Sequence, residues 1–358
     1  MAGGIRARKE AHIEIAASGR GSFRDNHTLL DEVTLIHQAL PELSLDEIDL
    51  SIELFGRKLQ APLLVGAMTG GTNSAARINR DLSSIAAELG LGFCLGSQRA
   101  MQEDPSSSSS FKLRDTAPDL LLIGNIGVVQ ARELGSQACG ELASQVSADA
   151  MAVHLNPAQE MMQTEGDRDF RRCTDTLENL AENLPMPLLV KETGCGISRE
   201  AGQAMVRAGI RYVETGGAGG TSWVRVEAER NESHHWLGET LGEWGIPTAA
   251  SLLSLSDLPL TRIAGGGLRS PLDIARAISL GAVACAVAQP VLAAYIESGP
   301  TGAKLFLSRM IEGLKVVCLL TGCRRAEDLA SAPRIIGPNL ERWQLFLDRH
   351  GQGAKSRT

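Results

Sequence analysis

Two glycine-rich runs are the residues of this chain whose type and spacing most clearly predict chemistry. Gly216–Gly220 and Gly265–Gly267 each follow a short apolar stretch. Glycine lets backbone N–H groups come within hydrogen-bonding distance of phosphate oxygens, and a helix that begins nearby adds its positive end. Ser270 and Pro271 are typical of such a helix start. One glycine run could simply form a tight turn, but two such runs favour a phosphate site.

Lys191 ends another apolar stretch, where an unpaired ammonium group would be costly. It therefore needs an anionic partner, which could be Glu192, Glu214 or the N1–C2=O edge of a reduced flavin ring. The residues alone leave these alternatives open. The segment Ala67–Thr69 could place backbone groups, one hydroxyl and a soft thioether along a planar ring, although a methionine at a strand end is more often part of a core.

Basic residues near the N-terminus could bind a polyanion. Arg8, Lys9 and His12 lie close together, and Arg99 follows a second apolar stretch. A diphosphate needs several cations, and arginine offers a bidentate fork, but an Arg-Lys pair is more often a solvated basic face. Glu160 could bind Mg²⁺ as a single carboxylate beside substrate phosphates, and otherwise it is an acidic residue that favours a helix start.

The elements that must position these residues alternate between short apolar runs and helix-period segments. The apolar runs are nearly continuous, as in parallel strands that are covered on both faces. About eight such units predict an α/β fold, a (β/α)8 barrel, with an open doubly wound sheet as the second choice. The predicted strands are Leu63–Gly66, Gly92–Gly96, Leu120–Gly124, Ala150–His154, Leu188–Lys191, Tyr212–Thr215, Arg262–Ala264 and Ala284–Ala288. The predicted helices are Ala75–Leu89, Gln130–Val146, Arg168–Asn183, Arg199–Ala208 and Pro271–Leu280.

Further segments flank and interrupt this repeat. Residues 1–60 form an N-terminal extension, and residues 61–358 form the barrel with helices at its C-terminal end. A long helix is predicted over Gly302–Thr321, and Ala326–Leu347 closes the chain. The serine run Pro105–Ser110 predicts a flexible loop. No linker suggests two independent domains.

Composition narrows the class of protein. The chain has 358 residues and a net charge of −7, which argues against a nucleic-acid-binding role. No run approaches the roughly 20 apolar residues needed to span a bilayer, and the charged start is unlike a secretory signal. The seven scattered cysteines favour reduced thiols. These features predict a cytoplasmic protein with no membrane partner.

Nine motifs occur in an order that resembles a known family. They are RKEAHI (8–13), HQALPEL (37–43), PLLVGAMTGG (62–71), GSQR (96–99), NIG (125–127), HLNPAQE (154–160), VKETGCGIS (190–198), GGAGGTSW (216–223) and GGGLRSPLDIARAISLGA (265–282). Together they resemble type II isopentenyl diphosphate isomerase, the flavin-dependent kind, over residues 8 to about 330. Two departures stand out: Ala11 replaces an acidic residue, and Gly265 replaces a serine.

The resemblance implies isomerisation of isopentenyl diphosphate to dimethylallyl diphosphate, with reduced FMN as the acid/base group, NADPH as its reductant, Mg²⁺, and a homo-oligomer. It implies catalytic roles for His154, Gln159 and Lys191, and Mg²⁺ binding by Glu160. The implied FMN contacts are Ala67, Met68, Thr69, Ser97, Asn125, Lys191, Thr221, Gly267, Leu268, Arg269, Ala288 and Gln289. The implied prenyl diphosphate contacts, which include the extension, are Arg8, Lys9, His12, Ser97, Gln98, Arg99, His154, Asn156 and Gln159.

Two other functions remain open on the sequence. An FMN-dependent hydroxy-acid oxidase or dehydrogenase would need a histidine base and arginines that grip a carboxylate beside the flavin. A flavin-binding sensor or scaffold would need no catalytic set, and the presence of Gln159, Glu160 and Lys191 argues against it.

Overall fold

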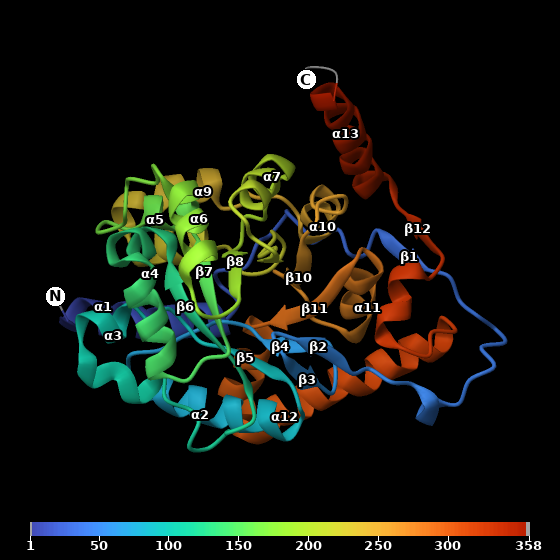
Figure 1. Ribbon diagram of the computed structural model, residues 1–358, viewed down its shortest axis with the longest axis horizontal. Coiled ribbons are helices and arrows are strands. Elements are labelled where there is room, and N and C mark those ends of the chain that lie inside the picture. The colour runs from blue at the N-terminus through green and yellow to red at the C-terminus, as the bar shows by residue number, and fades with distance from the viewer. Residues whose placement is uncertain (1, 356–358) are drawn as a thin grey trace.

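A closed barrel of eight parallel strands forms the centre of the computed structural model, which describes residues 2–355 (Figure 1). Each strand pairs with the next along the chain, and the last strand returns to the first, with Cys285 opposite Leu63. The (β/α)8 prediction is confirmed. The strands are β4 (Leu63–Val65), β5 (Gly92–Cys94), β6 (Leu121–Gly127), β7 (Ala150–Leu155), β8 (Leu188–Glu192), β9 (Tyr212–Glu214), β10 (Thr261–Gly265) and β11 (Ala282–Val287).

Small and branched apolar side chains fill the barrel interior. Leu64, Ile123 and Leu189 pack there against the alanines of β7 and β11. The alternate residues of the same strands face outward and join the larger core beneath the helices. Because both faces are buried, each strand reads as a continuous apolar run, which is why the sequence located all eight strands to within about three residues.

Helices surround the barrel and follow most strands directly. Thr72, Ser198 and Ser270 each accept the N–H of the third residue of the helix that they precede, which fixes where α2, α7 and α11 begin. The helices of the outer layer are α2 (Asn73–Glu88), α4 (Val128–Gln145), α6 (Cys173–Asn183), α7 (Arg199–Arg207), α10 (Thr248–Ser254), α11 (Pro271–Ser279) and α12 (Gln289–Leu320).

Additional short helices lie in the loops at the carboxyl ends of the strands, the end that carries the active site in barrels of this kind. They are α3 (Arg99–Glu103), α5 (Pro157–Met162), α8 (Trp223–Arg230) and α9 (His235–Leu241). The N-terminal helix α1 (Ala2–Ala17) packs against α8 and against α12 (Figure 1). The carboxyl end is therefore enclosed by segments that are distant in sequence.

The rest of the N-terminal region contacts the barrel interior and the C-terminal segment of the chain. The hairpin of β2 (Ile52–Leu54) and β3 (Arg57–Leu59) inserts Leu54 and Leu59 into the apolar cluster of the barrel interior. Strand β1 (Val33–Leu35) pairs with β12 (Arg334–Ile336). After β12 the helix α13 (Pro338–Lys355) projects from the body (Figure 1).

Two predictions about local structure are wrong, and a third is incomplete. The serine run Pro105–Ser110 is a 3-10 helix rather than a flexible loop, because Ser110 donates its hydroxyl to the Ser107 carbonyl and accepts the Gly71 N–H. Helix α12 is interrupted at Ser298 and Gly299, and the part that follows this break agrees with the predicted helix Gly302–Thr321, while the part that begins at Gln289 was not predicted. Helix α6 begins at Cys173, later than predicted, because residues 168–172 belong to the preceding loop.

Candidate active site

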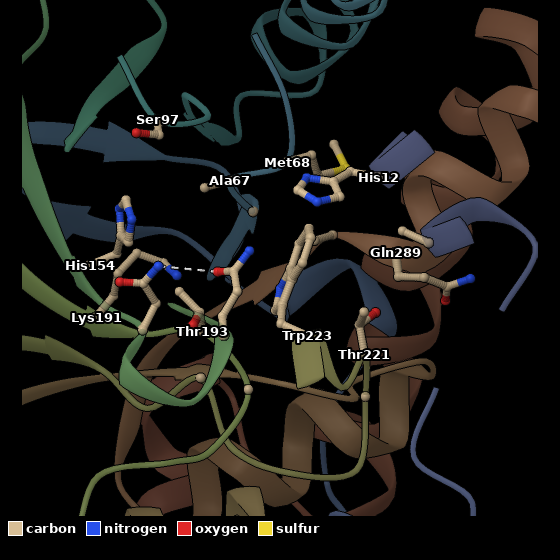
Figure 2. Close-up of a pocket in the computed structure, with 18 of the residues that line it drawn as sticks. His12, Ala67, Met68, Ser97, His154, Lys191, Thr193, Thr221, Trp223 and Gln289 are labelled. Atoms are coloured by element: carbon tan, nitrogen blue, oxygen red, sulfur yellow. Dashed lines mark hydrogen bonds between the residues drawn. The ribbon is translucent and has the colours of Figure 1, made fainter. Parts of the chain in front are cut away.

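A cavity of about 250 Å³ opens at the carboxyl ends of the strands, and α1 forms one of its walls. Figure 2 shows the side chains that line it, with the His12 ring of α1 against the Trp223 ring of α8. The predicted site residues that line the cavity are Arg8, Lys9, His12, Ala67, Met68, Thr69, Ser97, Arg99, Asn125, His154, Asn156, Gln159, Glu160, Lys191, Thr221, Gly267, Leu268, Arg269, Ala288 and Gln289.

Gln98 does not line the cavity, unlike its neighbours Ser97 and Arg99. Its side chain is fully buried and donates to the Leu142 carbonyl, while its Oε1 accepts the N–H of Asn125. Because successive residues here point in different directions, a contiguous motif overstates the number of residues that reach the site. Gln98 instead holds the backbone of Asn125 by a hydrogen bond on the side away from the cavity.

The two glycine runs meet at one wall of the cavity. Gly266 and Gly267 have φ values of 98° and 76°, a region that side chains rarely adopt. A Cβ on Gly267 would lie 2.4 Å from Thr28 Cγ2 and 2.7 Å from the carbonyl carbon of Gly219. Arg269 donates to the carbonyl of Gly219 and so fixes the two loops to each other. The result is a backbone-lined concavity next to the start of α11, which suits a phosphate group.

A row of three polar side chains crosses the strands beneath the cavity. His154 on β7, Lys191 on β8 and Glu214 on β9 are direct cross-strand neighbours, and all three line the cavity. The Lys191 Nζ donates to the Glu192 carbonyl at 3.0 Å and lies 3.8 Å from the Glu214 Oε1. Of the two acidic alternatives for its anionic partner, Glu214 is the one within ion-pair distance, because Glu192 offers Lys191 only its backbone carbonyl. Lys191 also lines the cavity.

Glu192 holds the loop that follows β8. Its Oε2 accepts the backbone N–H groups of Thr193, Gly194 and Cys195. Burial raises the pKa of Glu192 to about 7, and these three hydrogen bonds act in the opposite direction by favouring the charged carboxylate. The loop that carries Thr193 along the cavity is consequently rigid.

His154 is an uncharged hydrogen-bond acceptor toward the cavity. Its Nδ1 lies 2.9 Å from the Asn125 Oδ1, while Asn125 uses its Nδ2 to donate to the Leu95 carbonyl. The Oδ1 can only accept, so the His154 Nδ1 carries the proton and Nε2 is left with a lone pair. Burial, followed by the nearby Lys191 charge, lowers the pKa of His154 to about 3.

Glu227 on α8 organises the opposite wall. Its side chain is 1% exposed and accepts hydrogen bonds from Gln159 at 3.0 Å and Gln163 at 2.8 Å. The same carboxylate pairs with His12 of α1 at 2.9 Å and with Arg230. Burial alone would raise the pKa of Glu227, but the His12 contacts and the other donors bring it below its ordinary value.

Glu227, Gln163 and Trp223 were not identified from the sequence. Trp223 is the last residue of one of the quoted motifs. Glu227 follows it by one helical turn, and this spacing is the sequence feature that could have indicated that both residues face the same site. A helical glutamate among several others looks like a solvated residue, however. Only the packing of α1 and α5 on α8 shows that this one is buried.

Glu160 lies at the start of α5 and is mostly buried. Its Oε1 accepts from Asn156 at 2.8 Å and its Oε2 from the Asp167 N–H at 2.9 Å. The described residues contain no group of three or more His, Cys, Asp or Glu side chains that could hold a metal ion by themselves. A metal at Glu160 would therefore need most of its ligands from substrate or water.

Two polar groups in the cavity wall have no hydrogen-bond partner among residues 2–355: the Lys9 Nζ and the Thr69 Oγ1. Burial, and secondarily the neighbouring Arg8, lowers the pKa of Lys9 to about 8. Unpartnered buried donors are costly, so both groups indicate a ligand that supplies acceptors.

Comparison with known proteins assigns the chain to a family. Residues 5–108 and 248–335 match the FMN-dependent dehydrogenase family model. An isopentenyl-diphosphate delta-isomerase of Methanosarcina mazei is 42% identical over 335 residues, which are 92% of this chain and 91% of that protein. The chain belongs to the isopentenyl-diphosphate delta-isomerase family. A Nostoc relative of the same name is 41% identical and covers 82% of this chain and 85% of its own length.

Solved structures agree on the fold of this family member. A lactate oxidase of Pediococcus acidilactici superposes with a TM-score of 0.67 over 94% of both chains, at 14% identity. A mandelate oxidase variant that carries a monooxide FMN adduct gives a TM-score of 0.60 at 17% identity, covering 90% of this chain and 92% of its own. At such identities the likeness establishes the barrel architecture alone.

Proposed function

We propose that this protein isomerises isopentenyl diphosphate to dimethylallyl diphosphate with FMN bound in the barrel. The observation that carries the proposal is one cavity with three distinct parts: a glycine concavity, a Lys191–Glu214 floor and a basic wall from α1. Relatives of about 40% identity over most of this chain carry the isomerase name. The glycine concavity suits a cofactor phosphate, and the floor suits a flavin ring. The basic wall suits a second phosphate group.

The residues present fit FMN. The Gly266–Gly267 concavity would hold the phosphate, and the unpartnered Thr69 Oγ1 and the Lys191 Nζ would face acceptors on the ring. Reduced FMN supplies, when bound, a group that can donate and accept a proton. Met68 offers an apolar contact to the ring.

The basic wall fits a diphosphate. The unpartnered Lys9 Nζ requires an anion, and Arg8 and Arg99 lie on the same cavity. Both arginines already contact acidic side chains, Arg8 with Glu165 and Arg99 with Glu103. Those contacts hold the guanidinium groups at the cavity, where an incoming diphosphate would accept from them. Glu160 would contribute one carboxylate to Mg²⁺ carried by the substrate phosphates.

The double-bond shift needs a proton added at C4 of the substrate and another removed from C2, in a pocket that excludes water. The Gln159 amide is held by Glu227 and Asn156, so its orientation is fixed before substrate binds. Helix α1 covers this wall because His12 packs edge-on against Trp223, with ring centroids 5.1 Å apart. These residues orient the alkene and keep it dry.

The oxidase alternative has less support. It needs a histidine basic enough to take a proton from a hydroxy acid, whereas burial lowers the pKa of His154 to about 3 and makes it a weak base. Gln159, Glu160 and Glu227 all fall within residues 109–247, outside the segments that match the dehydrogenase family model. The segments shared with that wider family include Gly266 and Gly267 of the phosphate concavity.

The resemblance to flavin-dependent isomerases supports three finer proposals. NADPH supplies the electrons that reduce the flavin, the protein functions as a homo-oligomer, and it acts in the cytoplasm. Among the described residues, no helix is both long and apolar enough to cross a membrane.

The test is an isomerisation assay with purified protein, FMN, a reductant and Mg²⁺, each omitted in turn. In heavy water, we expect dimethylallyl diphosphate to form and deuterium to enter the five-carbon skeleton only in the complete mixture. A protein that retains reduced FMN but neither isomerises nor exchanges contradicts the proposal. Bleaching of the flavin by lactate without isomerisation supports the oxidase instead.

A further inference from the structure

Glu214 is a buried carboxylate that neither the fold nor the proposed reaction explains. Its side chain is 6% exposed, and it points into the barrel, where Cys94 is one of its neighbours. The Oε1 lies 3.8 Å from the Lys191 Nζ, which is too far for a hydrogen bond. The Oε2 has no hydrogen-bond partner in the described part of the chain.

Stability does not account for this arrangement. A buried ion pair with imperfect geometry and an unpartnered oxygen is often no better than well-packed apolar side chains. The Lys191 ammonium, moreover, already has a hydrogen-bond acceptor in the Glu192 carbonyl at 3.0 Å. Glu214 thus adds a negative charge next to Lys191 without accepting a hydrogen bond from the Lys191 ammonium.

Both charges line the cavity in which the flavin ring would lie. The ammonium of Lys191 favours electron density on the ring, and a carboxylate on the adjacent strand opposes it. Within the barrel interior such charges are only weakly screened. Burial raises the pKa of Glu214, and the neighbouring Lys191 charge opposes that rise by favouring the carboxylate.

We propose that Glu214 is a positioning residue that offsets the charge of Lys191 and thereby lowers the reduction potential of FMN in this site. This inference rests on the proposed function, because it requires FMN in the cavity. It adds a role for a residue that does not touch the reacting carbons. Partial neutralisation of Lys191 keeps the reduced ring from being held too firmly as an anion, which preserves its ability to give and take a proton.

The experiment measures the two-electron midpoint potential of the FMN-loaded protein by anaerobic dye equilibration. Glu214→Gln keeps the shape and removes the charge, so reduction becomes more favourable by roughly tenfold or more, a rise of about 30 mV. Glu214→Asp retains a charge and stays closer to the original potential. Lys191→Met lowers the potential.

The double variant provides the sharper test. In the Lys191→Met background Glu214 becomes neutral, so adding Glu214→Gln no longer changes the potential. Asp149→Asn is the matched control: this carboxylate pairs with Arg57 and Arg114 just before β7, at the opposite end of the barrel. It is expected to alter stability and leave the potential unchanged. If Glu214→Gln does not retain FMN, Glu214→Met is measured with the same expectations.

A change of less than twofold in the Glu214→Gln equilibrium, about 9 mV, overturns the inference. So does an equal effect of Glu214→Gln with and without Lys191. The proposed function fails in a different way, by absence of FMN binding or of isomerisation in the unaltered protein. If that protein binds FMN and isomerises while the potentials stay constant, only the role of Glu214 is refuted.

Discussion

Glu227→Gln is the substitution that most directly tests how the site is held in place. The carboxylate accepts from Gln159, Gln163 and His12 and pairs with Arg230, all from a side chain that is 1% exposed. Glutamine fits the same space but replaces one acceptor oxygen with an NH₂ group that faces donors. Both glutamine amides and His12 share Oε1, whereas Arg230 donates to Oε2. The new NH₂ group therefore faces either the Arg230 guanidinium or the two amides, and the contacts that remain lose their charged acceptor.

The size of the effect follows from these contacts. A hydrogen bond to a charged group contributes about 1.5–3 kcal/mol, which corresponds to a fall in kcat/KM of about 10- to 150-fold if the Gln159 contact is the one lost. The contribution of Glu227 is also pH-dependent. Its pKa is below the ordinary 4.5, so the stabilisation is present above that pH and lost as the pH falls through the folded pKa.

The assay is steady-state isomerisation together with thermal unfolding of the FMN-loaded protein. Glu229→Gln is the matched control, since Glu229 lies on the same helix, is 34% exposed and pairs with Arg20 at the surface. That variant should change kcat/KM by less than twofold. A Glu227→Gln enzyme within threefold of the unaltered one, with its unfolding temperature also unchanged, would refute the positioning role of Glu227.

Three further predictions concern the ligand groups. At pH 8.5 pyrophosphate binding should take up roughly 0.7 proton more in the unaltered protein than in Lys9→Met, because an anion raises the Lys9 pKa from about 8. Calorimetry in buffers of different ionisation enthalpy measures this difference. Gly267→Ala should weaken FMN binding by more than about tenfold in a fluorescence titration, since its Cβ meets Gly219. Gly299 has a similar φ but open surroundings, so the control Gly299→Ala should leave FMN affinity intact. Glu160→Ala should raise the Mg²⁺ concentration needed for half-maximal isomerisation, and normal turnover at every Mg²⁺ concentration would rule out the metal assignment.

The sequence by itself determined the barrel and the end of it that carries the site. Apolar runs that are continuous rather than alternating occur only where both strand faces are buried, and eight of them close a parallel barrel. The residues directly after those runs must then lie at one end. This is why Thr69, Asn125 and Lys191 could be placed at a common cavity from spacing and type alone.

Tertiary structure decided which neighbours of these residues reach the cavity and what charge each carries. Gln98 turns into the core although Ser97 and Arg99 do not, and Glu227 is buried although its helix looks solvated. The physical reason is that burial and hydrogen bonding depend on contacts between segments far apart in the chain. His12 and Glu227 are separated by more than 200 residues, and no local pattern fixes that they meet.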